Sequence, residues 1–422
     1  MEKRDTFAIY TLGCKLNFSE SSEISRQLQE FGLKQSNSPD YLLVNSCAVT
    51  AVAEKKVRNL VSKLSRQHPE SKIIILGCYS ELSAEEIAKW KNVSAVFGSA
   101  NKIDVVPYLV NGAESKTTSS SFFPAYSSHD RTRSFLKIQD GCDYHCSYCT
   151  VATARGISRS DTMKHVLKQL EEIHNQGIKE VILTGVNLGD FGRKNGSSLF
   201  ELLQEIEKLS LIERIRISSI EPNLLTDEII DLTAHSKIIM PHFHIPLQSG
   251  SDRILSLMKR RYNSTFFANK IHQIKKVIPH ACLAVDIITG FPDEQEKDFT
   301  DSYNFVNNLP ISYLHVFTYS KRPNTPAASM ENHIAPSVKK ERTKKLLLLS
   351  KEKKESFYKE YLGEKRSVLI ESDHKKGCLY GFTDNYIKIK LPYEERFINK
   401  ILPVELTEGN IVLNDFSTQD YE

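Results

Sequence analysis

The sequence predicts an α/β protein with three parts: an N-terminal Rossmann-like parallel sheet, a central partial (β/α) barrel and a small C-terminal antiparallel β-barrel. Short apolar runs alternate with helix-like segments in the first hundred residues, and six further strand–helix repeats follow. After Gly363 this alternation gives way to short strands and turns. We therefore divide the chain into residues 1–110, a polar, Ser-rich linker at 111–130, residues 131–360 and residues 361–422.

Three apolar runs in the N-terminal part each end at a cysteine, at Cys14, Cys47 and Cys78. Continuous β-rich runs of this kind predict buried parallel strands, and helix-like segments at 19–31 and 52–68 separate them. Successive cysteines are about one βαβ unit, ~30 residues, apart. Right-handed crossovers would then place all three sulfurs at the carboxyl edge of one sheet, where open α/β sheets bind ligands.

The central part shows six strand candidates separated by helical segments. The strands are expected at residues 134–139, 180–184, 215–219, 242–246, 283–289 and 313–319. Helices are expected between them, for example at residues 163–176, 199–209 and 225–234. This pattern predicts a full or partial parallel barrel with its active site at the carboxyl ends of the strands.

A Lys/Glu-rich helix at residues 338–362 is expected to connect the barrel to the C-terminal part. Its many glutamates favour a solvated connector over an RNA-binding arm. Strands are then expected at residues 366–371, 377–382, 386–391 and 410–413. About sixty residues of this kind predict the small antiparallel β-barrel.

The composition is that of an ordinary globular protein: 422 residues, 26% charged and 40% hydrophobic. The formal net charge of +4 permits an anionic partner without requiring one. No apolar run reaches transmembrane length, and the N-terminus lacks a signal-peptide layout, so we expect a cytoplasmic protein. In a reducing compartment, eight cysteines are better explained as metal ligands or buried residues than as disulfides.

A second cysteine trio, Cys142, Cys146 and Cys149, has CxxxCxxC spacing. Thiolates gathered in threes indicate iron–sulfur clusters in which one iron is left free for a small molecule. The alternatives are a zinc site completed by His145 or His242, or a chance grouping of thiols. Zinc sites usually combine paired CxxC or Cys/His motifs, and no second pair is present, so the cluster is favoured.

This cysteine loop resembles the signature of radical S-adenosylmethionine (SAM) enzymes, in which a 4Fe-4S cluster reduces SAM to methionine and a 5′-deoxyadenosyl radical. Further matches lie at the expected strand ends, in residues 183–185, 216–222 and 286–294. In such enzymes the cofactor performs the difficult chemistry and the protein positions it. The resemblance implies SAM contacts from Tyr148, Thr184, Gly185, Ser218, Glu221 and Gly290, and Gln248 is a further candidate for a polar contact in the barrel mouth.

With the N-terminal trio included, the whole chain resembles the methylthiotransferase family of radical SAM enzymes. The resemblance extends through residues 242–251 and 258–262. It implies that Cys14, Cys47 and Cys78 bind a second 4Fe-4S cluster, whose open iron carries the sulfur that is methylated and inserted. Cys282 and Cys378 have no partner spacing and are expected to be packing residues.

Residues 11–17, which contain Cys14, Lys15 and Leu16, resemble the family branch that acts on threonylcarbamoyladenosine. The isopentenyladenosine branch typically has Gln-Met in place of Lys15-Leu16, and the branch acting on a ribosomal-protein aspartate has Pro-Lys. The resemblance implies methylthiolation at C2 of threonylcarbamoyladenosine at tRNA position 37, with two SAM molecules and two clusters. It also implies a low-potential electron donor and a sulfur source.

The C-terminal part resembles a TRAM domain, a small RNA-binding module. Its basic residues are candidate phosphate contacts and its aromatic residues candidate base-stacking groups. These are Lys365, Arg366, Lys375, Lys376, Lys388 and Lys390, with Tyr380, Phe382 and Tyr386. The alternative is that the aromatic residues fill the domain and the lysines solvate its surface.

Two interpretations stay open at the level of sequence. His242 and His244 share one face of a strand and are either structural residues or substrate contacts. From another functional class, a non-catalytic, metal-stabilised RNA-binding protein also fits the basic tail and the cysteine trios. Iron content and colour would distinguish that protein from an enzyme.

Overall fold

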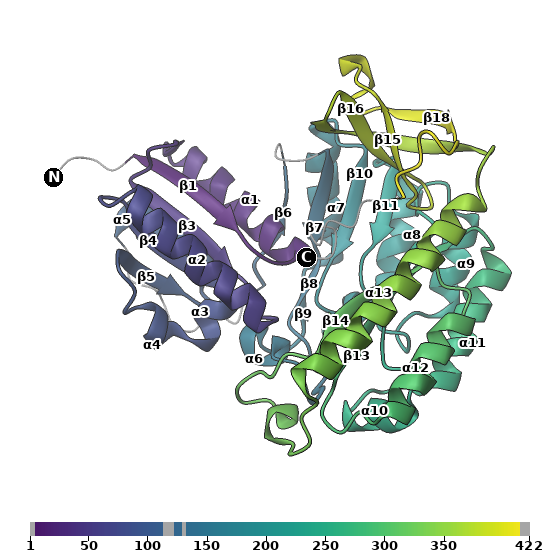
Figure 1. The fold of residues 1–422 in the computed structure, drawn as a ribbon. Helices are drawn as coiled ribbons and strands as arrows, with labels where there is room; N and C mark the ends of the chain where they lie inside the picture. The colour runs from purple at the N-terminus through teal and green to yellow at the C-terminus, as the bar shows by residue number, and fades with distance from the viewer. Residues whose placement is uncertain (1–4, 113–121, 129–131, 414–422) are drawn as a thin grey trace.

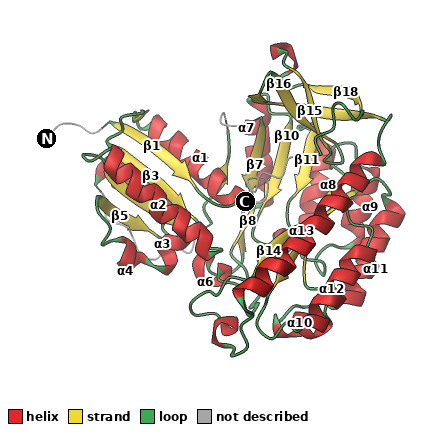
Figure 2. Ribbon diagram, viewed as in Figure 1, coloured by secondary structure: helices red, strands yellow, loops and turns green. Residues whose placement is uncertain are grey.

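The computed structural model describes residues 5–112, 122–128 and 132–413. It confirms the predicted class: an N-terminal parallel sheet lies beside a larger β/α unit, and a curled antiparallel sheet packs at one end of that unit (Figure 1). The same view coloured by secondary structure shows helices on the outside of the larger unit and strands within it (Figure 2).

The N-terminal sheet has the strand order β2-β1-β3-β4-β5, and all its pairings are parallel. The central strands are β1 (Thr6–Thr11), β3 (Tyr41–Ser46) and β4 (Lys72–Gly77); β2 (Lys34–Gln35) and β5 (Val93–Phe97) lie at the edges. The helices are α1 (Lys15–Glu30), α2 (Ala51–Gln67), α3 (Cys78–Leu82), α4 (Ala84–Ile87) and α5 (Val105–Asn111). Separate hydrophobic clusters bury the two faces of the sheet, because βαβ crossovers cover both.

The central unit is a partial barrel of six parallel strands. Its strands are β7 (Arg133–Lys137), β10 (Glu180–Thr184), β11 (Arg214–Ile217), β12 (His242–Gln248), β13 (Cys282–Thr289) and β14 (Tyr313–Thr318). They form two sheets, which isolated bridges join at Ile215–Ile239 and Ser219–His244. No pairing closes β14 onto β7 in the described residues, so the barrel is open on that side.

Helices cover the outside of the barrel and short elements decorate its ends. The helices are α6 (Val151–Arg155), α7 (Met163–Asn175), α8 (Leu199–Leu209), α9 (Asp227–His235), α10 (Asp252–Leu257), α11 (Ser264–Val277) and α12 (Glu296–Asn308). β8 (Gln139–Asp140) pairs with β9 (Arg159–Ser160). Within the stretch predicted as linker, residues 113–121 and 129–130 lie outside the described residues, whereas β6 (Ala125–Tyr126) is a short edge strand antiparallel to β7.

The predicted connector is α13 (Pro336–Lys359), and the sheet beyond it has the order β17-β16-β15-β18. Its strands are β15 (Lys365–Lys375), β16 (Cys378–Thr383), β17 (Lys388–Pro392) and β18 (Ile401–Glu405). The prediction of a strand at residues 410–413 is wrong, because only a single bridge, Ile389–Ile411, forms there. The fourth strand is β18, which contains Pro403 and lies at the sheet edge, where proline is tolerated.

The C-terminal sheet docks on the amino ends of the barrel strands. Glu180, at the start of β10, is fully buried beside Arg214 and Arg216. Arg216 also donates hydrogen bonds to the carbonyl oxygens of Thr383 and Asp384, at 2.8 and 2.9 Å. This contact positions the C-terminal unit on the barrel through main-chain carbonyls.

Two of the aromatic residues predicted to stack on RNA bases lie within this contact. The rings of Phe382 and Tyr386 stack at 4.7 Å, and Tyr386 also stacks on His242 at 4.2 Å. Arg133 and Arg216 lie over the ring of Tyr386. The prediction that Phe382 and Tyr386 stack on RNA bases is therefore corrected. The faces of these two rings are occupied by each other, by His242 and by arginines of the barrel.

The N-terminal unit contacts both edges of the open barrel. Ser19 of α1 donates a hydrogen bond to the carbonyl of Phe135 on β7, at 2.9 Å. On the other side, the segment after β14 supplies Arg322, which pairs with Glu54 of α2. The carboxyl edge of the N-terminal sheet is thereby held against the side where the barrel is open. Among the described residues, no helix is long and apolar enough to span a bilayer.

Candidate active site

The dispersed cysteines follow three adjacent strands of one parallel sheet, as predicted. Cys14 caps the start of α1 after β1, Cys47 follows β3, and Cys78 opens α3 directly after β4. Burial, together with the neighbouring Cys78 and Cys14 thiols, raises the pKa of the Cys47 thiol to about 12. That mutual influence shows that the fold brings three sequence-distant thiols together.

Two glycines allow the backbone to pass close to these thiols. Gly13 has φ +106°, and a Cβ there would lie 2.7 Å from Cys47 Cβ. Gly77 has φ +107°, and a Cβ would lie 2.5 Å from the carbonyl oxygen of Ser46. Any side chain at either position is both strained and obstructed, so the approach of the three strand ends requires glycine.

The compact trio lies in the loop between β8 and α6. Burial raises the pKa of Cys142 to about 11 and that of Cys149 to about 12; main-chain N–H donors oppose both shifts. These donors are Tyr144, whose nitrogen lies 3.3 Å from Cys142 Sγ, and Val151, at 3.4 Å from Cys149 Sγ. Arg260 Nη1 lies 3.1 Å from Cys146 Sγ. The loop therefore offers three convergent sulfurs surrounded by donors.

Both trios fit a 4Fe-4S cluster in donor chemistry and convergence. Each supplies three thiols within electrostatic reach of one another, and metal binding deprotonates such thiols. The zinc alternative with His242 fails on position, since His242 opens β12 and the cysteine loop lies at the carboxyl ends, about 20 Å of strand away. The other histidine of the zinc alternative, His145, is exposed to solvent within the cysteine loop.

The residues expected to contact SAM lie at the carboxyl ends of the barrel strands, on the side of the compact trio. Thr184 ends β10, Ser218 follows β11 and Gln248 ends β12. Gln248 has φ +72°, an uncommon conformation for a residue other than glycine, where β12 shifts register against β13. Gly290 follows β13 with φ +76°, and its N–H donates to Glu294 Oε2 at 2.7 Å.

Three more of these residues are Gly185, Tyr148, which lies within the cysteine loop, and Glu221. Gly185 lies against Gln139: a Cβ there would be 2.9 Å from Gln139 Oε1. Tyr148 packs edge-on against Phe291, with ring centroids 6.5 Å apart. Glu221 pairs with Arg260, and burial raises the pKa of Glu221 despite that partner. Arg260 thus links the Glu221 carboxylate to Cys146, a role that local sequence did not indicate.

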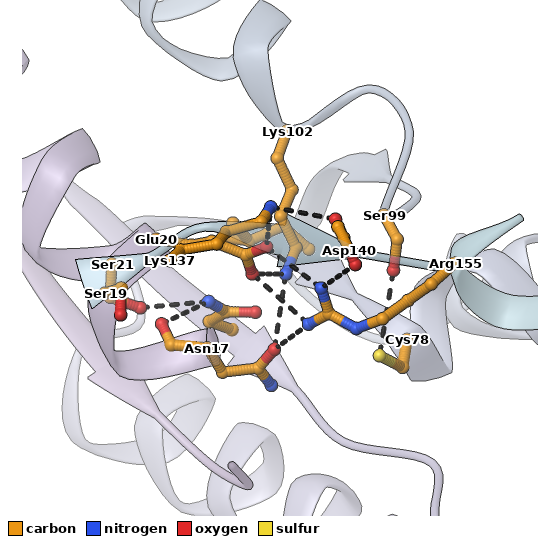
Figure 3. A network of polar contacts seen from close by, with 12 residues as sticks. Asn17, Ser19, Glu20, Ser21, Cys78, Ser99, Lys102, Lys137, Asp140 and Arg155 are labelled. Atoms are coloured by element: carbon orange, nitrogen blue, oxygen red, sulfur yellow. Dashed lines mark hydrogen bonds and ion pairs between the residues drawn. The ribbon is translucent and has the colours of Figure 1, made fainter. Parts of the chain in front are cut away.

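A buried polar network ties α1 of the N-terminal unit to Asp140 and Arg155, which precede and follow the compact trio in the chain (Figure 3). Its centre is Glu20 of α1, which accepts from Arg155 at 3.0 Å and from Lys137 at 2.7 Å and also pairs with Lys102. Arg155 and Lys137 also bind Asp140, at 2.9 and 2.8 Å. Asn17 Oδ1 accepts from Arg155 at 2.7 Å.

This network places positive charge beside the dispersed trio. Burial alone would lower the pKa of Arg155, but Cys78, Glu20, Asp140 and Cys14 together raise it well above its ordinary value. The network contains more basic than acidic groups, and that surplus stabilises thiolates at the N-terminal site. Sequence reasoning missed these residues, because nothing local distinguishes Glu20 or Arg155 from charged residues on helix surfaces.

Comparisons with known proteins agree with this geometry. Residues 136–306 match the family model "Radical SAM superfamily". Residues 6–98 match the model "Uncharacterized protein family UPF0004". The fold resembles that of a radical S-adenosylmethionine methyltransferase, TsrM from Kitasatospora setae, with a TM-score of 0.58 over 77% of each chain at 13% identity.

Several relatives align over nearly the full chain. Threonylcarbamoyladenosine tRNA methylthiotransferase MtaB of Bacillus subtilis is 35% identical over 97% of this chain and 95% of its own length. The protein of the same name from Thermotoga maritima is 38% identical over 91% and 90%. A tRNA-2-methylthio-N(6)-dimethylallyladenosine synthase from Pelotomaculum thermopropionicum is 31% identical over 96% of each chain.

Fold, cysteine loop and family model together define a radical SAM enzyme. With its N-terminal sheet and the full-length similarity to these relatives, the chain belongs to the tRNA methylthiotransferase family.

Proposed function

We propose that this enzyme adds a methylthio group to C2 of N6-threonylcarbamoyladenosine at tRNA position 37. The observation that carries the proposal is the pair of converging cysteine trios, one at the barrel mouth and one on the sheet that faces the open barrel. Relatives named for this reaction, at 35% and 38% identity, support the choice of nucleoside. The tRNA and the enzyme would meet in the cytoplasm.

In this proposal Cys142, Cys146 and Cys149 hold the cluster that binds SAM, and Cys14, Cys47 and Cys78 hold the second. When bound, the two clusters and two SAM molecules supply the electron, the radical, the methyl group and the sulfur. The remaining partners, also proposed, are a low-potential electron donor and a sulfur source. The domain limits, residues 1–110, 131–360 and 361–422, stay predictions.

The protein's own side chains bind and orient the clusters and SAM, and they neutralise the charge of the cysteine ligands. Arg260 donates to Cys146 Sγ and pairs with Glu221, so it fixes one face of the compact site. The residues proposed for SAM contact are Tyr148, Thr184, Gly185, Ser218, Glu221, Gln248 and Gly290. They gather at the carboxyl ends of the strands, which is the catalytic face of a β/α barrel.

Nucleoside mass spectrometry of bulk tRNA tests the proposal. A strain that lacks the gene should accumulate threonylcarbamoyladenosine without its 2-methylthio form, and the wild-type gene should restore that form. Retention of the 2-methylthio form in the deletion strain, with loss of methylthiolation on isopentenyladenosine or on a ribosomal protein, would assign the enzyme to another branch. Anaerobically reconstituted protein should contain about eight irons per chain.

A further inference from the structure

A cluster of histidines and one carboxylate lies inside the barrel, on β12, β13 and β14. His244 on β12 and Asp286 on β13 share a hydrogen bond of 2.5 Å between Nε2 and Oδ1. The ring of His315 on β14 lies 4.8 Å from that of His244, centroid to centroid. The side chains of His244 and Asp286 are 21% and 14% exposed, so this cluster is not sealed.

His242 extends the cluster toward the C-terminal sheet. Its side chain is buried, and neither ring nitrogen has a hydrogen-bond partner among the described residues. Burial, with the nearby charges of Arg216, His244 and Lys15, lowers the pKa of His242 well below its ordinary value. A buried neutral imidazole with two unused nitrogens is costly unless a ligand or water satisfies it.

Lys15 brings a cation from the N-terminal unit to this interior. It directly follows Cys14 at the start of α1, and its charge reaches His242 and His315 in the barrel. Within the part of the chain that the structure describes, the Lys15 side chain has neither a hydrogen bond nor an ion pair. An unpaired cation next to neutral imidazoles favours an anionic ligand.

We propose that Lys15, His242, His244 and His315 form a binding site for an adenosine that carries a carboxylate, with Lys15 pairing with that carboxylate. This inference rests on the proposed function and specifies how the nucleoside is selected. The imidazoles offer hydrogen bonds to the base and its urea group. The Asp286 carboxylate orients the His244 ring through the hydrogen bond between Nε2 and Oδ1.

The site also explains discrimination against an uncharged N6 group. An isopentenyl substituent has no partner for Lys15 and leaves that cation uncompensated beside buried imidazoles. A site built for a polar group rejects the analogue that lacks it, because its own polar groups are then unpaired. The position beside Cys14 therefore selects the substrate through charge.

The test uses two anticodon stem-loop RNAs, one with threonylcarbamoyladenosine and one with the corresponding carboxamide. Dissociation constants and kcat/KM are measured for the reconstituted full chain and for Lys15→Gln, Lys15→Arg and Lys34→Gln. Lys34→Gln is the matched control, since it removes the same charge from an exposed site of the same unit. Iron content is measured for every variant, so that loss of the neighbouring cluster is recognised.

Wild type should prefer the carboxylate RNA roughly ten- to hundredfold, the size expected for a charge-assisted hydrogen bond. In Lys15→Gln the preference should fall to about one, in Lys15→Arg most of it should remain, and Lys34→Gln should match wild type. Lys15→Gln with the wild-type preference would overturn this binding site alone. Wild type that modifies neither RNA would overturn the proposed function as well.

A metal ion is the competing occupant, because the ligand atoms of His244, Asp286 and His315 lie within 4.8 Å of one another. Metal analysis of wild type and His315→Asn decides between the two. One zinc or extra iron per wild-type chain, lost in the variant, would overturn the nucleoside site. Equal metal content in both proteins is the result expected here.

Discussion

Arg155 of the barrel and Glu20 of the N-terminal unit form a fully buried ion pair, with Nη1 and Oε1 3.0 Å apart. The two residues are 135 positions apart in the chain. Their contact connects the two units that carry the cysteine trios (Figure 3). Since each partner is buried, the pair requires that the two units dock in one orientation.

Breaking this pair should destabilise the docked structure. Arg155→Met removes one of the two basic partners that Glu20 and Asp140 share, at a cost of about 3–5 kcal/mol, as is usual when one member of a buried pair is removed. Chemical unfolding at pH 7 measures the loss. The control is Arg193→Met, because Arg193 is 67% exposed in its pair with Asp190 and should change stability by less than ~1 kcal/mol. Equal effects of both variants would contradict the structural role given to Arg155.

The contribution of Glu20 should depend on pH with a defined sign. Burial raises the pKa of Glu20, but Arg155, Lys102 and Lys137 outweigh burial and hold the pKa well below its ordinary value. The stabilisation is therefore present above the pKa of a glutamate in the unfolded chain, about 4.3, and is lost as pH falls toward the depressed folded value. Unfolding of wild type and Glu20→Gln from pH 7 to pH 3 should show the difference in free energy shrinking below about pH 4.5.

Gly77→Ala should impair the dispersed site. The added Cβ would lie 2.5 Å from Ser46 O, directly before Cys78, so the strand end must shift. We expect a loss of about 1–3 kcal/mol and incomplete iron loading. Gly32→Ala is the control, because Gly32 also has positive φ (+90°) but no atom within 4 Å of the added Cβ. A similar iron deficit in both variants would attribute the loss to backbone strain and contradict the role given to the contact with Ser46.

Replacing one cysteine trio at a time should show that each trio holds its own cluster and serves a different step. Replacing Cys14, Cys47 and Cys78 together by Ala should leave about four irons per chain, and should abolish the methylthiolated nucleoside while SAM cleavage persists. Replacing Cys142, Cys146 and Cys149 should abolish SAM cleavage. Cys282→Ala is the control: Cys282 is fully buried in an apolar cluster and should keep about eight irons. Iron loss in Cys282→Ala would contradict its assignment as a packing residue.

Arg260→Met should make the cluster on the compact trio harder to reduce. Its guanidinium lies 3.1 Å from Cys146 Sγ, and removing a positive charge and a hydrogen bond from a ligand sulfur lowers the reduction potential. EPR-monitored redox titration measures the shift. The adjacent Arg261 is exposed and lies over Tyr144, so Arg261→Met should leave the potential close to that of wild type.

Local sequence was enough for much of the fold. β10 and α8 occur at the predicted residues, and the other barrel strands begin or end within a few residues of their predicted limits. Apolar periodicity reports whether a segment is buried, so it locates such elements well. The same reasoning missed β18, where Pro403 masks the strand pattern, and it assigned Phe382 and Tyr386 to RNA although they pack against His242 and the barrel arginines.

By itself, the sequence determined the class of fold, the radical SAM loop and the three strand-end cysteines, because spacing along the chain and hydrophobic periodicity are local properties. Only the tertiary structure decided how the trios face one another. The Arg155–Glu20 pair, the Arg260–Cys146 contact and the approach of Lys15 to the barrel histidines each join residues from separate units or distant loops. Such contacts depend on how the units dock and on which buried charges pair with one another. Neither produces a periodic pattern in the sequence.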